Sequence, residues 1–149
     1  MTQLAPLTQE EVSTAVHEWY EKLDVHVPMV DILPMLVTEG LTQQWPEVTV
    51  TDLAGFEEWY QRVIRTFFDE LHTIQELNIT VAPDGQKADI KLVVYWEASA
   101  WTPGDRNSKR LMMDAHQTWE VVRSAQTGKP AIKTIIVDKI VEREGSASL

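Results

Sequence analysis

The sequence of 149 residues contains no cysteine, which excludes disulfide bonds, thiolate nucleophiles and cysteine-ligated metal centres. It has no apolar run close to the roughly 18 residues that a membrane-spanning helix needs. Its first residues lack the basic region and the apolar stretch of a secretory signal peptide. With 44% hydrophobic and 24% charged residues, the chain is predicted to be a soluble, cytoplasmic globular protein.

Basic residues are scarce in the N-terminal part of the chain. Residues 1–61 contain eleven acidic residues and one basic residue, Lys22, whereas residues 62–149 contain twelve of each. A phosphate-binding surface needs clustered lysine and arginine, and neither part has an excess of them. We therefore expect no nucleic-acid partner and no membrane partner. The acidic excess is typical of solvated helix faces, which aid solubility.

The first predicted helix begins at a capping box. Thr8 can serve as the N-cap, and Glu11 stands three residues later. Beyond them, apolar and aromatic residues that include Trp19 and Tyr20 recur at helical spacing. This pattern predicts an amphipathic helix that buries an aromatic face.

A second long helix is predicted over residues 53–67. Asp52 can cap its N-terminus, and an apolar stripe that contains Trp59 follows the 3.6-residue period. Prolines limit residues 28–40 to one short helix. Residues 41–50 favour a loop with a short edge strand, because Pro46 interrupts them.

After about residue 70, the apolar residues alternate with a period of two, which is typical of strands. Asp84-Gly85 is a strong hairpin turn, so the residues on its two sides are predicted to pair symmetrically about it. In that register, Thr73 lies on the same apolar face as Trp96. The agreement of two alternations predicts a long hairpin with one face buried.

The same register places His72 opposite Glu97, on the side away from the apolar face. With His116 nearby, two histidines and a carboxylate would be the right ligand types for a metal. The spacing carries no metal-binding motif, so we expect a cross-strand charge pair instead. No metal and no cofactor are predicted.

Two further strands are predicted over residues 110–123 and 132–143. Helices followed by long antiparallel strands are typical of an α+β domain whose helices lie on one face of the sheet. We expect a single domain over residues 1–149, with flexible ends at residues 1–7 and 144–149.

This order of elements resembles the nuclear transport factor 2-like superfamily, and within it the SnoaL-like cyclases and the ketosteroid isomerases. The resemblance covers roughly residues 8–143 and rests on element order, on the Gln-Trp-Pro edge at residues 44–46, and on the Glu-Trp-Tyr run at residues 58–60. It implies a cystatin-like cone, in which N-terminal helices pack on a strongly curved, mostly antiparallel sheet around an internal cup. It also implies a homodimer.

Comparison with the ketosteroid isomerases implies a partial catalytic site. The helix tyrosine of that family, an oxyanion donor, falls at or within one residue of Tyr20. The acid of its penultimate strand falls at Glu120. Its general base, an aspartate before a proline, falls at Trp45, which cannot accept a proton.

The two faces of the strand at residues 110–123 lead to different sites. The family comparison turns Glu120, and with it His116 and Thr118, into the cup, whereas simple burial turns the alternate apolar residues inward. In the first orientation, His116 would move protons near neutrality while Glu120 and Tyr20 stabilise an enolate oxygen. In the second, His116 is a structural or interface histidine. The prediction adopted is the first.

Aromatic side chains are expected to form the walls of the cup. The candidate ligand-binding residues are Trp19, Trp45, Trp59, Thr73, Trp96, Thr118 and Asp138. Asp138 interrupts an apolar run, and its direction depends on the face that its neighbours take. Aromatic walls with few polar groups suit a flat, largely apolar small molecule.

Two functions are compatible with this cup. The first is a SnoaL-like protein that binds a polycyclic or aromatic ligand and acts as a cofactor-free isomerase, lyase or cyclase by proton transfer. The second is a non-catalytic dimeric module of the same fold that senses a ligand or mediates an interaction. The Trp45 position favours the second, and the polar residues of the 110–123 strand favour the first.

Overall fold

The computed structural model describes residues 4–149. Its elements are α1 (Gln9–Asp24), α2 (Met29–Ile32), a 3-10 helix η1 (Leu33–Met35), β1 (Thr42–Gln44), β2 (Thr49–Val50), α3 (Leu53–Thr66), β3 (Phe67–Val81), β4 (Lys87–Ala100), β5 (Lys109–Arg123) and β6 (Pro130–Glu142). Within the described part of the chain, no helix is both long enough and apolar enough to cross a membrane.

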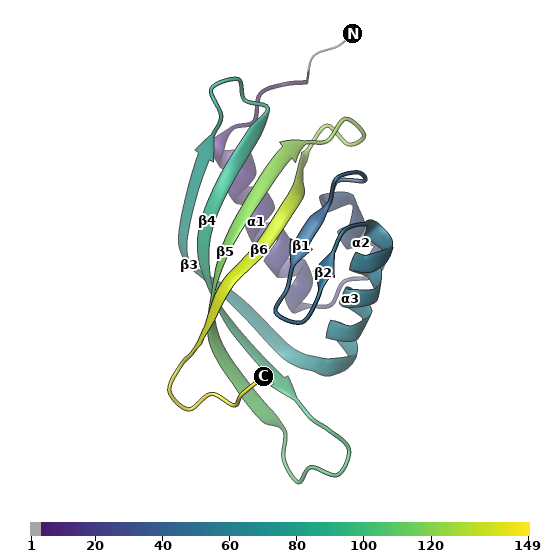
Figure 1. Cartoon of the computed structure of the whole chain (residues 1–149), viewed down its shortest axis with the longest axis vertical. Coiled ribbons are helices and arrows are strands. Elements are labelled where there is room, and N and C mark those ends of the chain that lie inside the picture. The colour runs from purple at the N-terminus through teal and green to yellow at the C-terminus, as the bar shows by residue number, and fades with distance from the viewer. Residues whose placement is uncertain (1–3) are drawn as a thin grey trace.

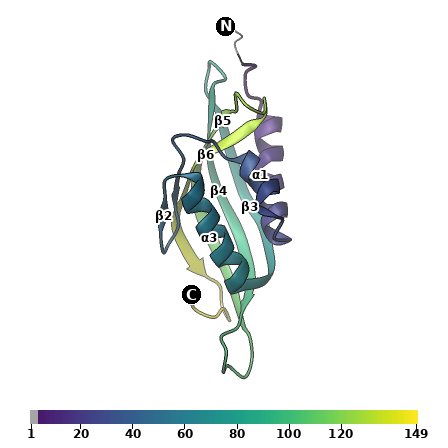
Figure 2. The ribbon, with the colours of Figure 1, turned by 90° about the vertical axis from the view of Figure 1, so that its right-hand side faces the viewer.

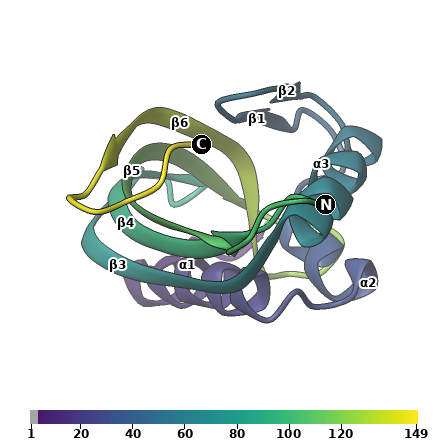
Figure 3. The ribbon, with the colours of Figure 1, turned by 90° about the horizontal axis from the view of Figure 1, so that it is seen from below.

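The strands form one six-stranded sheet in the order β2-β1-β6-β5-β4-β3. All neighbours pair antiparallel except β1 and β6, which are parallel. The four long strands are strongly curved (Figure 1), and α3 lies between the β1–β2 hairpin and α1 around the open side of the curl (Figure 2 and Figure 3). The predicted α+β cone with a curved, mostly antiparallel sheet is confirmed.

Both long helices begin where their capping residues predict. The Thr8 hydroxyl accepts a hydrogen bond from the backbone N–H of Glu11 at 3.2 Å. The Asp52 carboxylate accepts one from the backbone N–H of Gly55 at 2.7 Å. Each cap satisfies a backbone donor that the first turn of a helix leaves without a partner.

One face of α1 is fully covered by the sheet. Its buried residues are Val12, Ala15, Val16, Trp19, Tyr20 and Leu23. They join a continuous core with the inward side chains of β4, β5 and β6, and with Phe56, Trp59 and Tyr60 of α3. The aromatic residues at the C-terminal end of α1 therefore lie beside those of α3.

Arg123, at the end of β5, fastens the N-terminal segment to the sheet. Its guanidinium donates to the carbonyls of Ala5 (2.7 Å) and Pro6 (2.8 Å), and to both carboxylate oxygens of Glu11 (2.8 Å each). The hydrogen bond from Arg123 holds the pKa of the Glu11 carboxyl below its usual value. This set of contacts is far from the aromatic end of α1.

The predicted flexibility of residues 1–7 and 144–149 stays a prediction. The first three residues lie outside the described part of the chain. Leu7 N–H donates to a carbonyl in the β3–β4 turn at 2.8 Å, and Ala147 N–H donates to the carbonyl of Arg110 at 2.9 Å. The single domain predicted over the whole chain is likewise an expectation.

The β3–β4 hairpin has the predicted register only near its turn. Residues 76–81 of β3 pair symmetrically with β4 about the turn, but the register shifts by one between Ile74 and Glu76, where Gln75 forms a bulge. An inserted residue reverses which side chains face inward. The prediction that Thr73 lies on the inner face is therefore wrong, because Thr73 is exposed and His72 faces inward instead.

The predicted orientation of β5 is also wrong. Its buried residues are Leu111, Met113, Ala115, Gln117, Trp119 and Val121, which form the alternate apolar set. His116, Thr118 and Glu120 therefore lie on the outer face of the sheet. Burial of the larger apolar surface decides the orientation, since turning this strand over would expose Trp119 and bury the carboxylate of Glu120.

Candidate functional site

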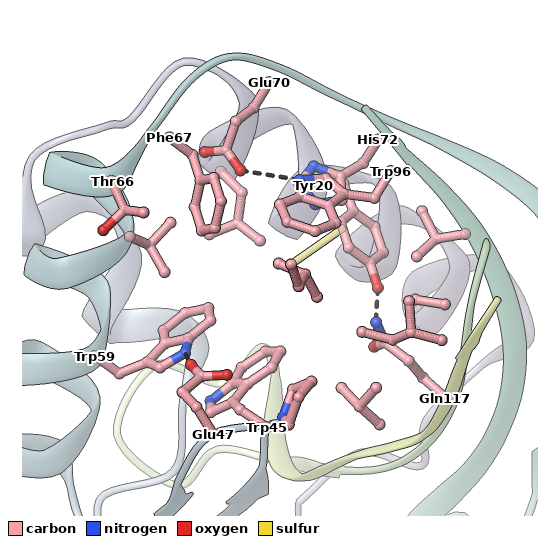
Figure 4. Close-up of a pocket in the computed structure, with 18 of the residues that line it drawn as sticks. Tyr20, Trp45, Glu47, Trp59, Thr66, Phe67, Glu70, His72, Trp96 and Gln117 are labelled. Carbon is pink, nitrogen blue, oxygen red and sulfur yellow. Dashed lines mark hydrogen bonds between the residues drawn. The ribbon is translucent and has the colours of Figure 1, made fainter. Parts of the chain in front are cut away.

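A cavity of about 480 Å³ lies between the inner face of the sheet and helices α1 and α3 (Figure 4). The indoles of Trp19, Trp45, Trp59 and Trp96 line it, together with Tyr20. These five residues are among those that the sequence predicts for the cup. The size and the aromatic walls are typical of small-molecule sites.

Two indoles form one wall of this cavity. Trp45 and Trp59 stack with centroids 3.9 Å apart and ring planes 7° from parallel. Trp59 Nε1 donates to Glu47 at 2.9 Å, and Trp45 Nε1 donates to Gln43 at 3.1 Å. Because both N–H groups are engaged, this wall offers carbon faces to a ligand.

The opposite wall holds an acid–histidine pair. His72 of β3 and Asp24, the last residue of α1, form a hydrogen bond of 2.6 Å between Nδ1 and Oδ1. The His72 ring stacks on Tyr20 with centroids 4.9 Å apart. Since the carboxylate accepts a hydrogen bond from Nδ1–H, the neutral ring has its free lone pair on Nε2.

The His72 ring lines the cavity, and Nδ1 is the ring nitrogen that Asp24 engages. The described residues give Nε2, the other ring nitrogen, no hydrogen-bond partner. Among the described residues, Gln43 Nε2 is the one side-chain polar atom that is fully buried and has no partner. His72 Nε2 also has no partner, so it must be at least partly accessible. An imidazole oriented by a carboxylate, with Nε2 free, is the arrangement of a general base.

Gln117 supplies a hydrogen-bond donor to the same cavity. Its Oε1 accepts from Trp119 Nε1 at 2.8 Å and from the Tyr20 hydroxyl at 3.1 Å. An indole N–H can only donate, so the amide oxygen must face Trp119. The Gln117 amide NH₂ therefore points away from that contact. It has no hydrogen-bond partner among the described residues, and it is not fully buried.

The Tyr20 hydroxyl is a structural donor in this arrangement. Burial raises the pKa of the Tyr20 phenol far above its usual value. The hydroxyl therefore stays protonated and holds the Gln117 amide in place. The oxyanion role that the sequence suggests for Tyr20 stays a prediction, since this proton is directed to Gln117.

Glu70 brings a second carboxylate to the cavity (Figure 4). Its Oε1 accepts from Trp96 Nε1 at 3.0 Å, and its Oε2 bonds to His26 Nε2. Across the core, Tyr60 donates to the carbonyl of Val27 at 2.7 Å. Burial and the negative charge of Glu70 raise the pKa of Tyr60 to about 12.

The polar residues predicted for the cup lie elsewhere. Thr118 donates to Asp138 at 2.7 Å on the outer face of the sheet, where Glu120 lies 3.6 Å from Lys133. His116 borders a separate shallow groove on that face. None of these four candidates is among the cavity-lining residues of the described chain, so the catalytic site drawn from His116 and Glu120 is not assembled.

Four polar residues at or beside the cavity are not among those predicted from the sequence, namely Asp24, His72, Glu70 and Gln117. One usable signal is Asp24 itself, because a carboxylate in the last turn of a helix opposes the helix dipole and needs another reason to be there. The predicted pairing of His72 with Glu97 is wrong because the bulge shifts the register of β3, as it does for Thr73. Glu97 pairs with Leu71 and lies 3.7 Å from Arg110.

Comparisons with known proteins bear on the fold. No protein-family model and no curated protein matches the sequence. A cystatin-like-fold protein from Nostoc punctiforme matches the structure with a TM-score of 0.66 at 13% identity, over 99% of this chain and 100% of that chain. The chain has the nuclear transport factor 2-like, cystatin-like fold.

Two solved structures of this nuclear transport factor 2-like fold carry functional names. A candidate scytalone dehydratase from Novosphingobium aromaticivorans matches with a TM-score of 0.69 at 13% identity, over 93% of this chain and 89% of that chain. A hexachlorocyclohexane dehydrochlorinase from Novosphingobium barchaimii matches with a TM-score of 0.71 at 11% identity, over 95% and 93%. At such identities the likeness establishes the fold alone.

Proposed function

We propose that this protein is a cofactor-free lyase or isomerase that removes a proton from carbon in a flat, largely apolar ligand. The observation that carries the proposal is the Asp24–His72 pair, whose histidine lines an aromatic cavity and has no hydrogen-bond partner at Nε2 among the described residues. In the proposed site, His72 takes the role that the sequence reasoning gave to His116.

The chemistry follows from three of the polar groups at or beside the cavity. His72 Nε2 takes a proton from a carbon beside a carbonyl, and Asp24 stabilises the resulting imidazolium. The electron pair moves onto the carbonyl oxygen, which the Gln117 NH₂ stabilises by a hydrogen bond. Such stabilisation is strong in a site with little water, because the local dielectric constant is low.

The names of two structural neighbours support the elimination form of this reaction. A dehydratase removes water and a dehydrochlorinase removes hydrogen chloride, and in each case a proton leaves carbon. A cavity of about 480 Å³ accommodates a ligand of two fused rings. A homodimer and a cytoplasmic location stay predictions.

Deuterium exchange tests the base without knowledge of the natural substrate. We choose 1-tetralone, a flat bicyclic ketone with acidic protons beside its carbonyl, and follow deuterium uptake in D₂O by NMR. His72→Asn should slow the catalysed exchange by about 100-fold or more. His116→Asn, which changes a histidine on the outer face, should leave it unchanged. Equal rates in wild type and His72→Asn would overturn the proposal.

The non-catalytic alternative has its own signature in the same experiment. Quenching of tryptophan fluorescence by 1-tetralone reports binding, since four indoles line the cavity. Binding that is lost in Trp96→Ala, without any catalysed exchange in the wild type, would support a ligand-sensing module instead.

A further inference from the structure

The connection between β4 and β5 projects beyond the rest of the chain at one end of the molecule (Figure 1 and Figure 2). Its first residue, Trp101, is 51% exposed, whereas a tryptophan in a folded protein is on average largely buried. Residues 101–110 contain three basic residues and one acidic residue. This segment, which we call the projecting loop, therefore combines an exposed indole with positive charge.

The projecting loop is held in one conformation by its own hydrogen bonds. Trp101 Nε1 donates to the carbonyl of Asp105 at 2.9 Å. The backbone N–H of Asp105 donates to the carbonyl of Thr102 at 2.9 Å, and the Asp105 carboxylate accepts from the N–H of Thr102 at 3.3 Å. Because the indole is already fixed, docking it on another surface costs little conformational entropy.

Two basic side chains of the projecting loop are exposed. Arg110 is engaged within the chain, since it lies 3.7 Å from Glu97. Arg106 and Lys109 are exposed and form no ion pair in the described part of the chain. Lys109 lies across the hairpin from the residue before Trp101. Tryptophan and arginine are enriched at the centres of protein interfaces, so the loop has the composition of a docking surface for an acidic partner.

The N-terminal helices offer an acidic surface of matching character. Val25, at the end of α1, and Val30, in α2, are each 72% exposed. Glu21 lies one helical turn before Val25, and Asp31 follows Val30, and both acids are exposed. Lys22 Nζ donates to the carbonyl of Asp31 at 2.7 Å, which ties α2 to the end of α1. We call these two valines and two acids the α1–α2 corner.

The projecting loop and the α1–α2 corner are complementary in polarity and in charge. An indole on one surface faces two valines on the other, and basic residues face acidic ones. The charge difference extends beyond the corner, since residues 1–61 contain eleven acidic residues and one basic residue. Opposite charges around an apolar centre speed association and disfavour wrong partners.

We infer that the projecting loop of one copy of this chain docks on the α1–α2 corner of a second copy. Since the loop projects beyond the rest of its own chain, it meets this corner on another molecule. The contact assigns surfaces to the predicted homodimer. None of the residues in the loop or the corner lines the cavity, so the inference does not depend on the proposed function.

Sedimentation velocity of the full chain at increasing protein concentration tests the contact. The wild type should form a species of at least twice the mass of the chain. Trp101→Ser should raise the dissociation constant by about 30-fold, as for the loss of an interface hot spot. Arg106→Glu should raise it by about 10-fold or more, because it brings like charges together. Lys129→Glu, in the exposed β5–β6 turn, makes the same change in net charge and should have no effect.

A charge exchange identifies the surface that receives the loop. Asp31→Arg should weaken association by about as much as Arg106→Glu, and the two changes together should restore most of it, because the charges are again opposite. All these side chains are exposed, so unchanged Tm values are expected for every variant. Equal weakening in the double variant and in both single variants would overturn the α1–α2 corner as the docking surface.

Two other results would overturn the inference as a whole. The first is a wild type that remains monomeric at every concentration. The second is association that Trp101→Ser and Arg106→Glu leave unchanged, since another surface would then join the copies. If the monomer instead binds phosphatidylserine vesicles and Trp101→Ser abolishes that binding, the projecting loop is a membrane contact and the second copy is excluded. The negative charge of the whole chain favours the second copy.

Discussion

The two halves of the cone use the same sheet and the same helix in opposite ways. In the packed half, toward the β3–β4 turn, the first turns of α1 fill the space over the sheet, and Val12, Val16, Ile90 and Val121 are at most 1% exposed. In the hollow half, indoles surround open space instead. Trp19 packs edge-to-face on Trp119 where the halves meet, with centroids 6.3 Å apart.

The comparison separates stability from chemistry. The packed half is held by close contact of aliphatic side chains, which accounts for stability in most small domains. In the hollow half, polar atoms are fixed by partners outside the open space, as for His72 by Asp24 and for Gln117 by Trp119. One half thus maintains the geometry that the other half needs.

The largest effect is expected where the halves meet. Trp119→Leu leaves a hole in close-packed surroundings and removes a donor to Gln117, so it should lower the free energy of unfolding by about 3 kcal/mol. Trp45→Leu removes an indole beside existing open space and should cost about 1 kcal/mol. Urea denaturation of both variants measures the difference, and equal costs would contradict the division into two halves.

Arg123 carries the next largest effect, at the far end of the packed half. Its side chain is 8% exposed, and Arg123→Met removes hydrogen bonds to three carbonyls and to Glu11, which should cost about 2 kcal/mol at neutral pH. Lysine at this position would keep the charge but lose the paired contacts.

The cost of Arg123→Met should depend on pH in one direction. Because the pKa of Glu11 is lowered in the folded state from its usual 4.5, the pair stabilises the fold fully above that pH. The contribution is lost as pH falls further and Glu11 becomes protonated. Denaturation curves between neutral pH and pH values below 4.5 should show the two proteins converging, and a constant difference would contradict the role of Glu11.

The smallest effect compares two turn glycines. Gly85 and Gly128 both have positive φ, but a Cβ on Gly85 would stand 2.4 Å from Pro6 Cβ, whereas one on Gly128 would meet nothing within 4 Å. Gly128→Ala should cost about 1 kcal/mol, from backbone strain alone. Gly85→Ala should cost about 1 kcal/mol more, because the N-terminal segment must move. Equal shifts in Tm would mean that this segment contributes little to the packed half.

Most of the fold follows from local sequence signals. The helix caps at Thr8 and Asp52, the turn at Gly85 and the alternation of apolar residues predict the long elements, because each signal acts over a few residues. The orientation of β5 was predicted wrongly from the family comparison, although its own apolar residues indicate it. Burial of apolar surface decides which face of a strand turns inward when one of the two faces carries a tryptophan.

The candidate site was only partly predictable. The aromatic walls are evident because large apolar residues recur on helical and strand faces. The Asp24–His72 pair was not predictable, because it depends on the bulge at Gln75, and no residue type in the sequence indicates a bulge there. The bulge reverses which residues of β3 face inward. All polar residues of β3 before the bulge therefore lie on the face opposite to the predicted one.

The bulge at Gln75 makes this site sensitive to insertion and deletion. In a chain without that extra residue, a leucine and a threonine of the same strand would face the interior, and the imidazole would lie at the surface. Divergence of activity within such a scaffold can therefore proceed by a single codon gained or lost, with every side chain of the apparatus still encoded.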